Sequence, residues 1–303
     1  MDKIDFSGRV AIVTGAGGGL GRLHALGLAR RGAKVIVNDL GGAVDGSGGS
    51  ATAAQKVVDE IKALGGQALA NGASVTDFAA VQAMVAQAMD AWGRVDVLVN
   101  NAGILRDKSF AKMELADFRT VLDVHLMGAV HTSKAVWPIM QAQKYGRILM
   151  TTSSTGLYGN FGQSNYGAAK LALVGLMQTL ALEGAKHGIH VNCLAPTAAT
   201  RMTEGLLPPA VLEALKPEAV VPAMLVAVSE QAPTRAILCA GAGTYEAAHI
   251  TLTRGLHLGL TEDTPERLLA RLDEVSDGAG ATVPASGAAQ GENEVRQALA
   301  VRA

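Results

Sequence analysis

Residues 9–22 read R-V-A-I-V-T-G-A-G-G-G-L-G-R. Their apolar first half predicts a short buried strand, and residues 24–31 continue with helical spacing. A glycine turn between a strand and a helix favours a phosphate-binding site, because the backbone can approach a pyrophosphate that the helix N-terminus attracts. The glycines Gly15, Gly19 and Gly21 follow the spacing G-x-x-x-G-x-G, and a plain tight turn is the alternative interpretation.

A second apolar run, Lys34 to Asn38, ends at Asp39, about 20 residues past the glycines. A carboxylate there can accept hydrogen bonds from an adenosine ribose and would repel a 2′-phosphate. Asp39 therefore favours NAD over NADP, with a strand-end turn aspartate as the alternative. Residues 41–50, which we call the glycine-rich loop, read G-G-A-V-D-G-S-G-G-S and predict an exposed loop rather than a helix or strand.

Strand-like and helix-like segments alternate along the rest of the chain. This order predicts the α/β class, a Rossmann-like doubly wound parallel sheet of about seven strands in a single domain over residues 1–255. Residues 256–303 predict a C-terminal extension with a short helix from Thr264, a flexible Ala/Gly-rich segment over 277–290 and one marginal helix at the end. The other strands are predicted at 67–70, 95–99, 147–150, 189–194 and 236–240, and the other helices at 52–64, 78–92 and 115–143.

The composition excludes several classes of function. The 303 residues carry a formal charge of −1 and no basic stripe, so a nucleic-acid partner is not expected. No apolar run is long enough to span a membrane, and the first residues lack a secretory pattern. Cys193 and Cys239 lie in apolar segments, as reduced thiols of a cytoplasmic protein do, and the seven histidines show no metal-ligand spacing. We therefore expect a cytoplasmic protein without a metal.

Residues 153–170 read S-S-T-G-L-Y-G-N-F-G-Q-S-N-Y-G-A-A-K. Tyr166 and Lys170 are four residues apart, so on a helix they share one face. A fixed cation favours the phenolate of a tyrosine, whose ordinary pKa is roughly 10. Ser153 follows a predicted strand and could bring a hydroxyl to the same place. Taken alone, the Tyr-x-x-x-Lys spacing also fits a solvated tyrosine and a surface lysine.

Four motifs in this order resemble the short-chain dehydrogenase/reductase family over residues 5 to about 250. They are T-G-A-G-G-G-L-G, the N-N-A-G of residues 100–103, Ser153, and the Tyr166/Lys170 pair. The glycine-rich loop and the runs N-A-G-I-L-R-D-K-S-F and Y-G-N-F-G-Q-S-N-Y are similar to a subgroup, the (3R)-hydroxyacyl-CoA dehydrogenase domains of type 2 peroxisomal multifunctional enzymes. These enzymes are also called 17β-hydroxysteroid dehydrogenases type 4.

The resemblance implies an NAD-dependent oxidoreductase that interconverts a secondary alcohol and a ketone. Tyr166 would be the general acid/base, Lys170 its pKa-lowering partner, and Ser153 the group that orients the substrate oxygen. His125 replaces the asparagine that many family members place in the helix after the fourth strand. The implied substrate contacts are Ser153, Tyr158, Phe161 and Tyr166. The implied cofactor contacts are Gly15, Gly19, Leu20, Gly21, Asp39, Ser74, Val75, Asn101, Ala102, Gly103, Tyr166, Lys170, Pro196 and Thr200.

The resemblance also implies a small-molecule substrate, an acyl-CoA thioester for this subgroup, and a homodimer or homotetramer. Other substrates within the same fold stay open: a steroid or other secondary alcohol, or a 3-oxoacyl thioester that is reduced. A nucleotide-binding protein that has lost its chemistry is the alternative from another class. The presence of Ser153, Tyr166 and Lys170 together argues against it.

Overall fold

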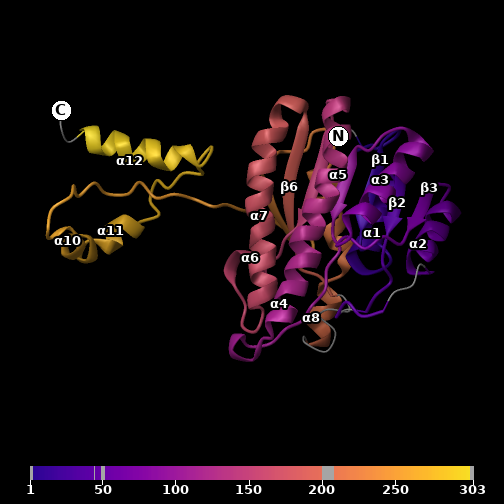
Figure 1. The fold of residues 1–303 in the computed structure, drawn as a ribbon, viewed down its shortest axis with the longest axis horizontal. Helices are drawn as coiled ribbons and strands as arrows, with labels where there is room; N and C mark the ends of the chain where they lie inside the picture. Colours follow the sequence, from indigo (N-terminus) through magenta and orange to yellow (C-terminus); the bar gives the residue numbers. More distant parts are fainter. Residues whose placement is uncertain (1–2, 44, 49–51, 200–207, 301–303) are drawn as a thin grey trace. The chain divides into compact units, whose positions relative to one another are not determined.

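The computed structural model describes residues 3–43, 45–48, 52–199 and 208–300 (Figure 1). The chain forms two compact units that divide after Ala247, whereas the sequence analysis places the boundary after residue 255. Thr200, predicted as a cofactor contact, lies outside the described residues.

The first unit is built on one sheet of eight strands in the order β3-β2-β1-β4-β5-β6-β7-β8. The ladders from β3 to β7 are all parallel, which confirms the predicted doubly wound α/β class. Central strands such as β1 and β4 are buried along their whole length, as expected for a parallel sheet with helices on both faces. The strands are β1 Val10–Thr14, β2 Lys34–Asn38, β3 Gln67–Asn71, β4 Val97–Asn100, β5 Gly146–Thr151, β6 Ile189–Pro196, β7 Ile237–Gly241 and β8 Thr244–Ala248.

β8 was not predicted. It follows β7 after Ala242 and Gly243, whose φ angles of 51° and 77° suit a two-residue hairpin turn, so β8 runs antiparallel to β7. Its residues are mostly exposed and carry no apolar alternation that would indicate a strand.

Helices cover both faces of the sheet. α1, α2 and α9 share one hydrophobic core with β1 and β2. α3 packs on α5, and α7 packs on both α4 and β6. The bounds are α1 Gly19–Ala29, α2 Thr52–Ala63, α3 Phe78–Trp92, α4 Leu115–Leu122, α5 Gly128–Gln143, α6 Ser154–Tyr158, α7 Ser164–Gly184, α8 Pro209–Ala214 and α9 Val221–Ala227.

The predicted helix over residues 115–143 is interrupted. A π-helical turn, Asp123–Met127, separates α4 from α5 and carries His125. The apolar periodicity continues through this turn, so the sequence pattern does not reveal it. Such turns are frequent at functional sites.

The helix Ser164–His187 has the length and mean hydropathy of a membrane-spanning helix. It contains α7, which packs on β5 and β6 and buries Lys170, so it is a core helix of the first unit. Core helices commonly meet these length and composition criteria.

The second unit comprises α10 Thr264–Ala270, α11 Leu272–Ser276 and α12 Ala288–Ala300. The short helix predicted from Thr264 is present. The segment predicted as flexible over 277–290 holds one bridge, Leu252 to Thr282, and its last residues already belong to α12. None of the three helices has a buried residue.

His24 on α1 predicts how stability depends on pH. It is fully buried, and neither ring nitrogen has a partner among the described residues. Burial lowers its pKa from 6.5 to about 4, so the folded state keeps the ring neutral where the unfolded chain would protonate it. The free energy of unfolding should therefore fall as pH drops from about 6.5 towards 4, by about 2 kcal/mol at pH 5.

Urea unfolding at pH 8, 6 and 5 measures this effect. His24→Leu should remove the part of this loss that His24 contributes and leave the part that comes from the buried His125, and the same substitution at the partly exposed His187 should leave the whole loss in place. Equal losses of stability in the wild type and in His24→Leu would contradict the assignment.

Candidate active site

The glycine turn lies at the carboxyl ends of β1 and β4, where the strand order reverses. This is the place where open α/β sheets bind ligands. A Cβ atom at Gly15, which has a φ of 62°, would lie 2.8 Å from the Cα of Ala102, and a Cβ at Gly21 would collide with the Gly15 carbonyl. The turn therefore requires glycine at both positions for its own folding.

Asn101 fastens this turn to the end of β4. Its Nδ2 donates to the carbonyls of Thr14 and Gly15, at 3.0 and 3.1 Å. The Thr14 hydroxyl accepts from the backbone N–H groups of Asn101 and Ala102. Asn101 and Ala102 thus contact the glycine turn directly.

The N-terminus of α1 fits a phosphate group. Its N-cap residue is Gly18, no side chain caps the helix, and the first turn holds no acidic residue. A Cβ at Gly19 would meet no atom within 4 Å, so the turn is open there. Uncapped N–H groups and the helix dipole favour an anion such as a pyrophosphate.

Asp39 holds the backbone of the turn in place. Its Oδ2 accepts from the N–H of Gly17 at 2.7 Å and its Oδ1 from that of Gly41 at 2.6 Å. Asp39 therefore acts as a turn aspartate at the end of a strand, which was the alternative interpretation of its sequence position. Each carboxylate oxygen retains a lone pair for a further donor, so a ribose hydroxyl can still bind.

The remaining predicted cofactor residues lie on neighbouring strand ends. Val75 is buried, and its carbonyl accepts from His131 Nδ1 at 2.9 Å. The Ser74 hydroxyl lies 2.8 Å from that of Thr76, and Pro196 ends β6.

Ser153, Tyr166 and Lys170 come together in the structure. Ser153 is the N-cap of α6, and its hydroxyl accepts from the Thr155 N–H at 3.2 Å and forms a hydrogen bond with the Tyr166 phenol. Tyr166 and Lys170 lie one turn apart on α7, with the ammonium 5.5 Å from the centroid of the phenol ring. Lys170 Nζ donates to the carbonyl of Thr151 at 2.6 Å.

The electrostatics differ from the sequence-based expectation that Lys170 lowers the pKa of Tyr166. Burial raises the pKa of Tyr166, and the hydrogen bond with Ser153 only partly opposes this. Burial also lowers the pKa of Lys170 to about 7. The free-energy cost of burying the charged forms therefore exceeds the attraction between a Tyr166 phenolate and the Lys170 ammonium. As a result, Lys170 can gain or lose a proton near neutral pH.

His125 is buried against Tyr166. The two rings meet edge to face, with centroids 5.2 Å apart. Its Nε2 lies 3.1 Å from the Ile104 nitrogen and 2.8 Å from the Ile104 oxygen. Nδ1 is buried with no partner among the described residues. Burial and the Lys170 charge hold the pKa of His125 well below its usual 6.5, so the ring is neutral.

A small cavity lies beside His125 and Lys170. It has a volume of about 10 Å³, and Asn100 also lines it. A polar cavity of this size holds about one water molecule.

Tyr158 and Phe161, predicted as substrate contacts, are exposed by 73% and 90%. Tyr158 ends α6, and Phe161 lies in the loop between α6 and α7. This loop is tied to the segment after β4 because Lys108 N–H donates to the Gly162 carbonyl at 2.9 Å. These side chains are available to a substrate but are not packed against Tyr166.

Two residues near the site were not predicted. Asn165 donates to the carbonyl of Arg106 and accepts from the N–H of Tyr166, so it fixes the start of α7. An asparagine in the first turn of a helix is the signal that could have indicated it. Arg106 bonds to two separate elements, and the sequence carried no signal of this.

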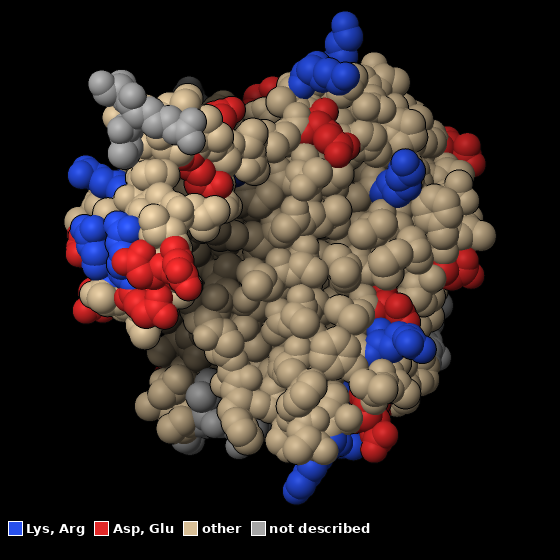
Figure 2. Space-filling model, turned by 60° about the vertical axis from the view of Figure 1, so that its left-hand side comes forward, with Lys and Arg blue, Asp and Glu red and all other residues tan. Residues whose placement is uncertain are grey.

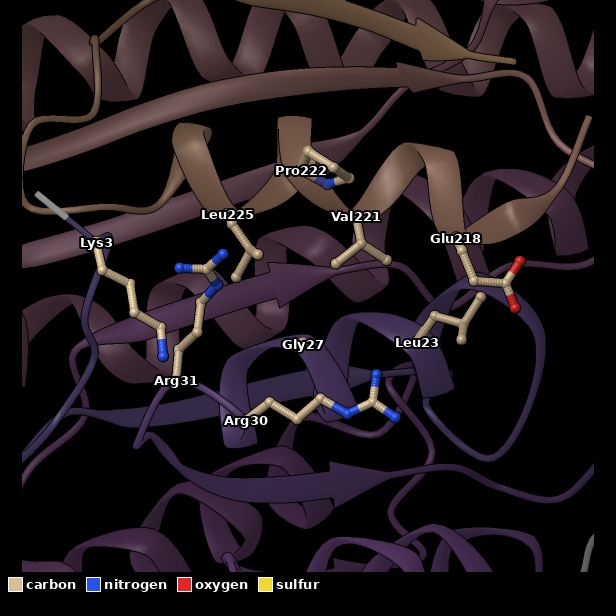
Figure 3. Close-up of a pocket in the computed structure, with 9 residues that line it drawn as sticks. All are labelled: Lys3, Leu23, Gly27, Arg30, Arg31, Glu218, Val221, Pro222 and Leu225. Atoms are coloured by element: carbon tan, nitrogen blue, oxygen red, sulfur yellow. The ribbon is translucent and has the colours of Figure 1, made fainter. Parts of the chain in front are cut away.

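A larger hollow of about 390 Å³ lies elsewhere, between α1 and α9 (Figure 3). None of the predicted site residues lines it. Its lining residues are Lys3, Leu23, Gly27, Arg30, Arg31, Glu218, Val221, Pro222 and Leu225.

Comparison with known proteins leads to a family of dehydrogenases. The family model described as short chain dehydrogenase matches residues 9–208. A short-chain type dehydrogenase/reductase of Mycobacterium tuberculosis is 48% identical over 91% of this chain and 96% of its own length. The peroxisomal hydratase-dehydrogenase-epimerase of Saccharomyces cerevisiae is 49% identical over 91% of this chain, which spans only 31% of that relative.

Solved structures lead to the same family. Full-length peroxisomal multifunctional enzyme type 2 from Drosophila melanogaster matches with a TM-score of 0.80 and 36% identity, over 98% of this chain and 50% of that one. A 7α-hydroxysteroid dehydrogenase complexed with NADH matches with a TM-score of 0.71 and 32% identity, over 79% of this chain and 95% of that one.

The chain therefore belongs to the short-chain dehydrogenase family. It is an oxidoreductase that acts on a small molecule with a nicotinamide cofactor, and its resemblance to the type 2 multifunctional enzymes is confirmed.

Proposed function

We propose that the protein is an NAD-dependent dehydrogenase that interconverts a (3R)-3-hydroxyacyl-CoA and a 3-oxoacyl-CoA. The meeting of the Ser153 hydroxyl, the Tyr166 phenol and the buried Lys170 ammonium at the carboxyl edge of the sheet carries the proposal. Relatives named as multifunctional and hydratase-dehydrogenase-epimerase enzymes support the substrate class. Because the chain spans about a third of their length, the reaction catalysed by the whole of such enzymes is not assigned to it.

In the oxidation, Tyr166 first gives up its own proton towards Lys170, and the resulting phenolate takes the proton of the substrate hydroxyl while Ser153 holds the substrate oxygen. NAD⁺, when bound, would supply the hydride acceptor for the carbon that bears this hydroxyl. Lys170, whose pKa is about 7, can pass on a proton at neutral pH.

We propose that His125 assists this proton transfer as the substitute for the family asparagine. Its Nε2 can accept from the Ile104 N–H or donate to the Ile104 carbonyl, depending on the tautomer. The unpartnered Nδ1 can therefore donate or accept. A water in the cavity that His125 and Lys170 line would connect the two side chains.

Asp39 supports the choice of NAD over NADP. Its carboxylate closes the end of β2 with both oxygens on backbone N–H groups, so it cannot turn away from a 2′-phosphate without breaking the turn. Arg22, the cationic residue of α1, forms an ion pair with Glu60. It is therefore already engaged and is not a ready partner for a 2′-phosphate.

The predicted homodimer or homotetramer has support from the solvent face of α7, where Leu171 and Leu182 are exposed by 46% and 50%. Figure 2 brings this side of the first unit forward and shows a broad area without charged side chains. Light scattering of the purified chain measures its mass.

The cytoplasmic location stays a prediction, and several relatives are named as peroxisomal.

NAD⁺ reduction against a panel of (3R)- and (3S)-3-hydroxyacyl-CoA thioesters, with steroid alcohols alongside, tests the reaction. We expect turnover of the (3R) thioesters.

Tyr166→Phe should lower kcat by roughly 100-fold or more while coenzyme binding survives, because the general base is lost. Tyr245→Phe, a phenol on β8 away from the site, is the matched control. Turnover of steroids alone would overturn the substrate class, and an active Tyr166→Phe would overturn the mechanism.

Asp39→Asn should reduce the preference for NAD. It removes the charge that repels a 2′-phosphate, and its amide oxygen can keep one of the two backbone hydrogen bonds, so the ratio of kcat/KM for NAD to that for NADP should fall by roughly tenfold. Asp59→Asn, on the exposed side of α2, should leave the ratio unchanged. A wild-type enzyme with higher kcat/KM for NADPH than for NADH would show that the ribose assignment is wrong.

His125→Leu should lower kcat by roughly 100-fold, whereas His125→Asn should retain most of it, since an amide can also bind the cavity water. The comparison is made at saturating coenzyme, with thermal unfolding as a check on folding. Wild-type kcat in His125→Leu would exclude the relay.

A further inference from the structure

The segment after β4, residues 104–108, joins three parts of the site. The Ile104 backbone contacts His125, and the Arg106 carbonyl accepts from Asn165 at the start of α7. Lys108 bonds to the loop between α6 and α7. The segment therefore lies beside His125 and beside the start of α7, the helix that carries Tyr166.

The same segment contacts the described residues of the glycine-rich loop, 41–43 and 45–48. A Cβ at Gly46 would lie 3.2 Å from Ile104 Cγ2, so the loop rests on this side chain. The loop forms its own turn, in which the Asp45 carboxylate accepts from the N–H and the hydroxyl of Ser47, at 2.9 and 2.7 Å.

The Arg106 guanidinium connects the loop to α4. Its Nε donates to the Asp45 carbonyl at 3.0 Å, and its Nη1 pairs with the Asp117 carboxylate at 2.8 Å. Both side chains of the ion pair are less than a third exposed. One planar group thus holds two acceptors from elements 72 residues apart in sequence, since 117 − 45 = 72.

The order of the strands shows which part of the sheet edge lies under the contact between residues 104–108 and the glycine-rich loop. The glycine-rich loop starts at the end of β2, and residues 104–108 follow β4, while β1 lies between these strands. A contact between the two segments must therefore cross the carboxyl end of β1, where the glycine turn begins.

We propose that Arg106 is a positioning residue for the coenzyme: by holding the Asp45 carbonyl and the Asp117 carboxylate together, it keeps residues 45–48 over the adenosine side of the crevice. The inference rests on the proposed function, because it presupposes that a dinucleotide binds at the glycine turn. It adds a residue that needs no contact with the coenzyme itself. Lysine cannot replace this arginine, because a single ammonium lacks the fork that serves two acceptors at once.

Titration of NADH fluorescence without substrate, for the full chain, tests the proposal. Arg106→Gln and Arg106→Lys should both raise the NADH Kd by roughly tenfold, as the loss of a charge-assisted hydrogen bond does. Asp117→Asn should raise it in the same direction, and the double variant Arg106→Gln/Asp117→Asn should be no worse than Arg106→Gln. At saturating coenzyme, kcat should stay within about twofold of the wild type or rise, because the coenzyme leaves faster.

Arg119→Gln is the matched control, because it removes the same charge from the exposed face of α4. It should leave the Kd unchanged. If Arg106→Gln fails to fold, Arg106→Lys carries the same test with the charge retained.

An NADH Kd for Arg106→Lys and Asp117→Asn equal to that of the wild type overturns the inference and leaves the proposed function intact. A lowered kcat with an unchanged Kd overturns it as well, since Arg106 would then act on the chemistry. Failure of the wild type to bind NADH overturns the proposed function, and the inference with it.

Discussion

The burial of the Lys170 ammonium is the constraint on which the site depends. Its Nζ donates to the Thr151 carbonyl at 2.6 Å, so the side chain is held at the end of β5. This requires α6 to cross α7 very closely, and a Cβ at Gly156 would lie 2.7 Å from the Lys170 Cβ. The Thr152 hydroxyl donates to the Lys170 carbonyl and fixes the same turn of α7. Burial is also what brings the pKa of the ammonium to about 7.

A shared desolvation cost sets the pKa values of Tyr166, Lys170 and His125. The pKa of Tyr166 is raised and that of Lys170 lowered, so each group alone prefers its neutral form. His125 is neutral for the same reason. Lys170, with a pKa of about 7, is the member of this set that can take up or release a proton near neutral pH.

Patterns that depend on local spacing could be predicted from the sequence. The bounds of β2 and α3 match the prediction, because a continuous apolar run and an Asp77 N-cap with a Gly93 C-cap mark them. The π-helical turn around His125 could not be predicted, since it preserves the apolar periodicity. The pKa of Tyr166 was expected to fall, because a sequence shows the neighbouring charge but not the depth of burial.

Side-chain bonds between distant elements are the other part that the sequence conceals, and Ile104 shows why they matter. Its backbone meets the ring of His125, and its side chain meets Gly46 of the glycine-rich loop. Ile104 therefore lies between that loop and a ring that packs on Tyr166. Under the proposed function, residues for coenzyme binding and for proton transfer that are far apart along the chain meet at this one residue.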